Sequence, residues 1–123
     1  MMFNVLVGNR DDHAKNHAST MAADGRWSLT TPHDLTLSGS PGGPGGQHNL
    51  TLTGEGRAPG PAQFAQVAQR ASLGQAMAIR ITELVRSGLA TWPQAAAAAG
   101  LNRRRIGMVG TMLNRTSNNS RWS

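Results

Sequence analysis

A helical pattern of apolar residues fills the second half of the chain, and it restricts the fold more than any other sequence feature. Residues 62–71 carry apolar side chains at the i, i+3, i+4 and i+7 spacing of one helix face, and residues 75–91 and 103–114 repeat the pattern. A further helical element begins at Trp92-Pro93 and ends at Gly100. The side chains expected on buried faces are Phe64, Val67, Ala68 and Ala71, then Met77, Ile81, Leu84, Val85 and Leu89, and finally Ile106, Val109, Met112 and Leu113.

Shorter elements are expected before these helices. Met1–Val7 is apolar with one polar interruption, which fits either the end of a buried helix or a short strand. The runs His17–Met21 and Trp27–Thr31 flank Asp24-Gly25, a pair that is typical of a β-hairpin turn because glycine accepts a positive φ. The sequence therefore predicts an α+β, mainly helical fold with one β-hairpin.

Glycine and proline mark the connection between the hairpin and the helices. Residues 38–47 (SGSPGGPGGQ) predict a flexible, low-complexity loop. The alternating run at residues 50–57 ends in Glu55, which lies between two glycines and which we interpret as a turn residue rather than a functional one. The polar residues 116–123 predict a disordered tail, so the expected domain is residues 1–115.

Composition limits the classes of protein that remain. The formal net charge is +6, with twelve basic and six acidic residues, which suits either an acidic partner or a simply solvated surface. The chain has no cysteine, which excludes disulfides and thiolate metal sites. No apolar run is long enough for a membrane span, and the first residues lack the basic region of a signal peptide, so we expect a cytoplasmic protein.

The residues with the clearest chemical meaning are Asp11, Asn16 and Asp34. Asp11 and Asn16 lie five apart in a polar loop, and the predicted hairpin brings Asp34 back toward them. Two carboxylates and an amide oxygen form the hard-oxygen set that Mg²⁺ and nucleotide phosphates require, and an Asp-x4-Asn loop followed by a later Asp is the arrangement of protein kinases. Taken alone, Asp-x4-Asn also fits a solvated loop with turn hydrogen bonds.

Longer strings around these residues resemble one family. "GNRDDHAKN" at residues 8–16, the hairpin, and "LTTPHDL" at residues 29–35 closely resemble the C-terminal lobe of HipA-like serine/threonine kinases, the bacterial toxins of HipBA-type toxin–antitoxin systems. The later "HNLTLTGEGRAPGPAQFAQVA" at residues 48–68 is also similar to the family. The resemblance covers about residues 1–110 and implies the C-terminal lobe of a HipA/protein-kinase-like fold whose hairpin carries the active loop.

The resemblance implies a role for each matching residue. Asp11 would be the catalytic base, with His13 as a positioning residue in the same loop. Asn16 and Asp34 would hold Mg²⁺ on the phosphates of ATP, and Lys15 would contact the γ-phosphate or the substrate. The partners implied are ATP, a protein serine and a HipB-like antitoxin. Asp12 receives no role, and His33 stands where the family more often has an aromatic residue.

One departure from the family concerns the N-lobe. A kinase needs a glycine-rich loop and a strand lysine that contact the phosphates. Lys15 is the only lysine of the chain, and the glycines of residues 39–46 follow the motif instead of preceding it. We therefore expect a truncated kinase without its N-lobe, inactive alone. The alternative is a non-catalytic fragment that pairs with an antitoxin or with a separately encoded N-lobe.

Two further motifs have both a functional and a simpler interpretation. His13 and His17 lie four apart, a spacing that on a helix can bind zinc, but this segment does not carry a helical pattern and offers no third ligand. Arg103-Arg104-Arg105 could contact nucleic-acid phosphates, although three consecutive arginines do not share one helix face. A solvated helix start is the simpler interpretation of the arginines.

Overall fold

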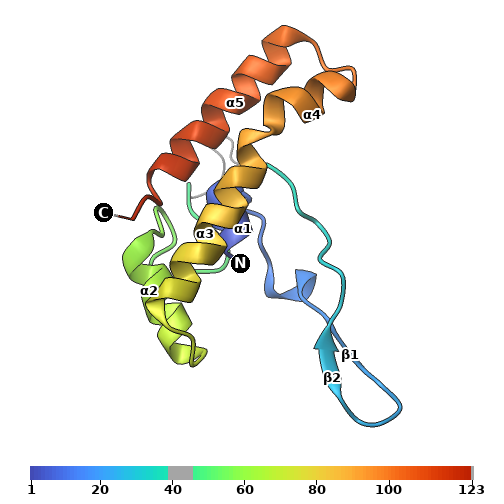
Figure 1. Cartoon of the computed structure of the whole chain (residues 1–123), viewed down its shortest axis with the longest axis vertical. Coiled ribbons are helices and arrows are strands. Elements are labelled where there is room, and N and C mark those ends of the chain that lie inside the picture. The colour runs from blue at the N-terminus through green and yellow to red at the C-terminus, as the bar shows by residue number, and fades with distance from the viewer. Residues whose placement is uncertain (39–45, 123) are drawn as a thin grey trace.

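The computed structural model describes residues 1–38 and 46–122, so residues 39–45 of the predicted glycine-rich loop lie outside the described residues. The described residues form five α-helices, one short 3-10 helix and one antiparallel hairpin (Figure 1). This agrees with the predicted α+β, mainly helical class. In chain order, the elements are α1 (Met2–Val7), η1 (Ala14–Asn16), β1 (Ser19–Met21), β2 (Trp27–Leu29), α2 (Pro61–Arg70), α3 (Gln75–Ala90), α4 (Trp92–Ala98) and α5 (Arg103–Asn118).

Helix α1 occupies the centre of the molecule, behind α3 in Figure 1. Six residues are too few for a stable isolated helix, but α1 packs against both α3 and α5, and Leu6 is fully buried. Gly8 ends the helix with a φ of 73°, a conformation that favours glycine. The Thr116 hydroxyl of α5 donates to the Leu6 carbonyl at 2.7 Å, which satisfies one of the free carbonyls at the end of α1.

The hydrophobic core lies between α1, α2 and α3. Phe64 is fully buried, and Val5, Leu52 and Ala68 pack with it. The face predicted for α2 is confirmed at Phe64, Val67 and Ala68. Helix α2 begins at Pro61, and the Gln63 side chain accepts from the Gly60 N–H at 3.0 Å, which caps its first turn.

The predicted core face of α3 is only partly right. Ile81, Val85 and Leu89 do pack against the core. Met77 and Leu84 were expected beside them but are 40% and 72% exposed. The side chains that complete the buried face are small: Ala78 and Thr82, which lie under α1. The side of α3 that faces α1 is therefore formed by small side chains, and Met77 and Leu84 lie off this side.

The hairpin projects away from the helices at the end of two extended segments (Figure 1). Ser19 pairs with Leu29, and Met21 pairs with Trp27. The turn is the one predicted, with Gly25 at a φ of 83° and Asp24 accepting from the Arg26 N–H at 3.1 Å. Every residue of both strands is exposed, so no core holds the hairpin in place.

The end of the chain differs from the predicted disordered tail at residues 116–123. Helix α5 continues to Asn118, and the side chain of Ser120 is fully buried. The reason is local packing: Thr116 bonds to α1, Arg86 of α3 donates to the Ser117 carbonyl at 2.7 Å, and Trp122 packs against the core. None of the helices in the described ranges is long and apolar enough to cross a membrane.

Candidate active site

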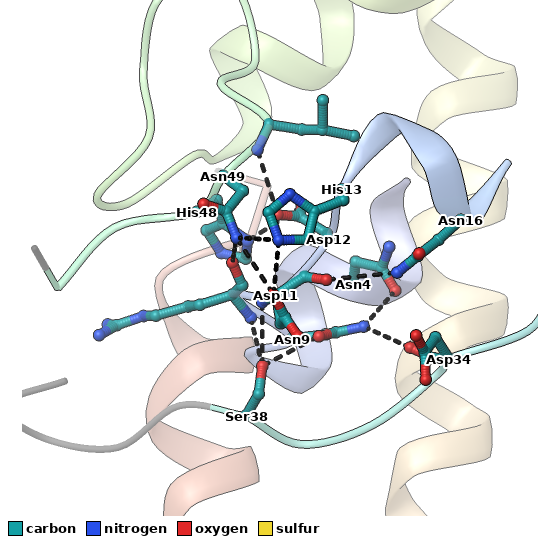
Figure 2. A network of polar contacts seen from close by, with 12 residues as sticks. Asn4, Asn9, Asp11, Asp12, His13, Asn16, Asp34, Ser38, His48 and Asn49 are labelled. Carbon is teal, nitrogen blue, oxygen red and sulfur yellow. Dashed lines mark hydrogen bonds and ion pairs between the residues drawn. The ribbon is translucent and has the colours of Figure 1, made fainter. Parts of the chain in front are cut away.

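The Asn9 side chain connects the polar loop to the segment that carries Asp34 and to helix α1. Its side chain is buried and donates to the Asn4 Oδ1 at 3.3 Å and to the Asp34 carbonyl at 2.9 Å. It also accepts from the Ser38 hydroxyl at 2.9 Å. One amide therefore joins helix α1, the polar loop and the segment that leaves the hairpin, as Figure 2 shows.

Ser38 fixes the start of the polar loop. Its Oγ accepts from the backbone N–H of Arg10 at 2.8 Å and of Asp11 at 3.0 Å. The same hydroxyl donates to Asn9, so Ser38, more than 25 positions later in the chain, holds the backbone on both sides of Arg10. The geometry of the loop thus depends on the segment that follows the hairpin.

Asp12 and His48 form a buried pair at the base of the loop. The Asp12 Oδ2 lies 3.2 Å from the His48 Nδ1, and both side chains are almost inaccessible to solvent. The other carboxylate oxygen accepts from the Leu50 N–H at 3.2 Å. A buried carboxylate without partners would be strongly destabilising. These contacts satisfy both oxygens and give Asp12 a structural role that the sequence had not assigned.

Asp11 differs from its neighbour because it is exposed. Its Oδ1 lies 2.8 Å from the His13 Nε2 and 3.4 Å from the Asn49 Nδ2. Asn49 Nδ2 also approaches the His13 Nε2 at 3.3 Å and donates to the Arg10 carbonyl at 3.1 Å. The structure therefore places the predicted base and the predicted positioning histidine in direct contact, with Asn49 beside both.

Asp34 has an unusual backbone conformation for a residue other than glycine. Its φ of 58° lies in the left-handed region, where side chains with a Cβ are strained. The Asn9 bond to its carbonyl holds this conformation, and its side chain remains exposed. Aspartate adopts this region more often than most residues with a Cβ, and Thr53 and Ser72 also have a positive φ, of 51° and 57°.

Asn16 and Lys15 both belong to η1, which follows the loop. The Asn16 Nδ2 donates to the Asp11 carbonyl at 3.3 Å, so Asn16 is oriented by the backbone of the predicted base. Lys15 is exposed in the same short helix. Within the described residues, no contact joins the side chains of Asn16 and Asp34; each is connected to the loop separately.

Asp34 and Asn16 carry oxygen donors, which are the ligand type that Mg²⁺ prefers, whereas zinc prefers nitrogen and sulfur. Asp34 offers carboxylate oxygens and Asn16 an amide oxygen, and Mg²⁺ takes few protein oxygens and leaves its other positions to water and phosphate. Residues 1–38 and 46–122 contain no group of three or more histidine, cysteine or acidic side chains that could hold a metal. The zinc interpretation of His13 and His17 gains no support from the structure, since His17 is an exposed residue at the end of η1.

Six of the residues labelled in Figure 2 had no predicted role. They are Asn4, Asn9, Asp12, Ser38, His48 and Asn49. A signal existed for His48, because the alternation His48, Leu50, Leu52 places all three on one side of an extended segment, and His48 and Leu52 are buried. Ser38 and Asn49 flank the glycine-rich loop, and no sequence period assigns them a direction.

The fold and site together define a mainly helical domain whose polar Asp-x4-Asn loop is held by the end of a hairpin. The model of the HipA-like C-terminal domain family matches residues 1–92, which is more than half of the chain, and the chain therefore belongs to that family. No curated protein and no solved structure matches the chain.

Proposed function

We propose that this chain supplies the catalytic loop and the metal ligands of a HipA-like serine/threonine kinase. The observation that carries the proposal is the bond from the Asn9 side chain to the Asp34 carbonyl, which connects the two separated parts of the motif. Membership of the family supports a toxin-related role. The more specific proposal, that the chain takes part in phosphoryl transfer, rests on the residues of the loop and their contacts.

In the proposed reaction, a serine hydroxyl of a protein attacks the γ-phosphorus of ATP. The new bond joins the serine oxygen to phosphorus, the bond to the bridging oxygen of ADP breaks, and Asp11 takes the hydroxyl proton. Asn16 and Asp34 would hold Mg²⁺, which supplies charge neutralisation at the phosphates when bound. His13, 2.8 Å from the Asp11 carboxylate, fixes its direction.

The exposure of Asp11 suits this role. A base that receives a proton from another protein must be reachable from solvent, and the Asp11 side chain is 68% exposed while that of Asp12 is 2% exposed. The two adjacent carboxylates are thus separated into a reactive and a structural one. Contacts to the α- and β-phosphates, for which the chain offers no second lysine, would come from an N-lobe outside these 123 residues.

The test is calorimetric titration of Mg²⁺–ATP into the purified chain. We expect binding that Asp34→Asn weakens at least about tenfold, because the substitution removes one negatively charged ligand. Asp24→Asn, which changes an exposed carboxylate at the hairpin turn, is the matched control and should bind as the unmodified chain does. Equal binding by both variants would contradict the metal role of Asp34.

A second candidate function is a non-catalytic module that pairs with an antitoxin or with a separately encoded N-lobe. The observation in its favour is the hairpin, where Met21, Trp27 and Leu29 are 60%, 69% and 77% exposed. Absence of any Mg²⁺–ATP binding would favour this candidate. A nucleic-acid-binding role has weaker support, since Arg103, Arg104 and Arg105 lie exposed at the start of α5 in the way expected of a solvated helix start.

A further inference from the structure

A cavity lies beside the polar loop, with Arg10 of the loop among its lining residues. It has a volume of about 370 Å³ and lies between the end of α1, the second half of α5 and the segment before α2. Among the described residues, its lining includes neither Asp11 nor Asn16 nor Asp34. It is therefore separate from the site proposed above.

The charge around this cavity is of one sign. Arg10, Arg57 and Arg115 reach it from three different parts of the chain. Within the described residues, no carboxylate lines the cavity, and none of the three guanidinium groups takes part in an ion pair. Like charges around one space repel each other, and an anion bound among them relieves that repulsion.

Two acidic groups that contact residues of the lining already have partners. Asp12 is paired with His48, which itself lines the cavity. Glu55 accepts at one oxygen from the backbone N–H groups of Arg57 and Ala58, at 2.6 and 3.0 Å. The carboxylates of Asp12 and Glu55 thus have imidazole and backbone partners. The arginines that line the cavity are therefore available to bind a ligand.

The rest of the lining is largely apolar. Val5 of α1, Leu37, Pro59 and Met112 of α5 contribute to the walls. A cavity of about 370 Å³ is at the small end of the range for small-molecule sites. The walls therefore fit a ligand with one anionic group and a compact apolar part.

We propose that this cavity binds a small phosphomonoester. Guanidinium groups form paired, charge-assisted hydrogen bonds with phosphate oxygens, which makes arginine suited to this anion. Arg10 directly precedes Asp11, and the backbone N–H groups of both residues donate to the Ser38 hydroxyl. A ligand bound by the Arg10 side chain would therefore lie next to the polar loop. The proposal does not depend on the proposed kinase function.

The probe for the test is phenyl phosphate, with inorganic phosphate and phenol as its two halves. Calorimetric titration of the full chain should give binding in the order phenyl phosphate, then inorganic phosphate, with none for phenol. Arg57→Gln and Arg115→Gln should each weaken phenyl phosphate binding at least about tenfold, since each removes a charge-assisted contact. Both arginines are exposed, so the variants should fold, which circular dichroism checks.

Two control variants show whether the binding is specific to this cavity. Arg121→Gln removes an exposed arginine that does not line the cavity and should leave binding unchanged. Asp24→Asn should also leave it unchanged, because this exposed carboxylate at the hairpin turn is not part of the lining. Equal losses in Arg115→Gln and Arg121→Gln, or no binding of phenyl phosphate at millimolar concentration, would overturn the proposal.

Discussion

Asp11 and Asp12 show how neighbouring residues of one type take opposite roles. The exposed carboxylate of Asp11 contacts His13, while the Asp12 carboxylate is enclosed and bonded to His48 and to the Leu50 N–H. The sequence string identifies the pair, but it does not show which member faces solvent. That is decided by His48 and Leu50, which lie more than 35 positions further along the chain.

Removing the buried carboxylate should destabilise the fold. Asp12→Ala leaves the His48 ring and the Leu50 N–H without their partner in a buried place, and we expect a loss of about 2–4 kcal/mol in the free energy of unfolding. Asp11→Ala, its exposed neighbour, should cost about 0.5 kcal/mol or less. Urea unfolding of both variants measures the difference. Similar losses in the two variants would show that the Asp12 contacts contribute little.

The site could be predicted from the sequence only in part. The string from Asn9 to Asn16 and the later Asp34 were identified, and the structure connects them through Asn9. The supporting contacts of Ser38, His48 and Asn49 were not, because they arise when the chain folds back on itself. His48 shares an alternating pattern with Leu50 and Leu52, but the contacts of Ser38 and Asn49 join residues far apart in the sequence and leave no periodic signal.

At the scale of elements, the turn at residues 52–55 controls the approach to α2. Leu52 and Glu55 bond to each other through their backbones, with Thr53 and Gly54 at positive φ between them. Glu55 then accepts from the N–H groups of Ala58 and Arg57, which confirms its interpretation as a turn residue. These bonds favour the charged form and hold the pKa of the Glu55 carboxyl below its ordinary value of 4.5.

This turn should make stability depend on pH. A lowered folded-state pKa means that the contribution of Glu55 is complete above the ordinary value of 4.5 and is lost as the pH falls through the lower, folded-state pKa. We expect Glu55→Gln to lower the melting temperature at pH 7 and to lose that effect at acidic pH. Thermal unfolding of both proteins from pH 7 to pH 3 is the measurement. A constant difference across this range would contradict the assignment.

The helices were predicted better than their faces. Three or four helices after the glycine-rich loop were expected from apolar spacing and from proline and glycine at their ends, and the described residues contain four, α2 to α5. Leu84 was wrongly predicted to be buried because the spacing rule gives most weight to large apolar residues. The buried face of α3 instead uses Ala78 and Thr82, and the Thr82 hydroxyl donates to the Met2 sulfur of α1.

At the scale of the whole molecule, the helical part and the hairpin differ in how they are stabilised. Helices α1, α2 and α3 share one core, whereas both strands are exposed on every residue. Two paired strands without a core are marginal in water. Trp27 and Leu29 lie on one face of the hairpin with Met21, so this face offers apolar surface to another molecule.

We expect the isolated chain to associate through this face. Light scattering coupled to size-exclusion chromatography should show a mass that rises with protein concentration. Replacing Trp27 and Leu29 by threonine, which suits a strand, should weaken the association at least about tenfold, because two large apolar side chains are lost. Leu84→Gln removes an equally exposed side chain on α3 and is the matched control. A chain that stays monomeric at every concentration would contradict the expectation.

The way the polar loop is closed has a consequence for the continuity of the chain. The backbone leaves the helical part at Arg10 and returns at Asn49, whose N–H donates to the Arg10 carbonyl at 3.1 Å, beside the buried pair of Asp12 and His48. This bond joins the two ends of the segment that carries the hairpin. We therefore expect a cut at the exposed turn of Asp24-Gly25 to leave two pieces that stay associated through these contacts, the shorter one anchored by α1 in the core.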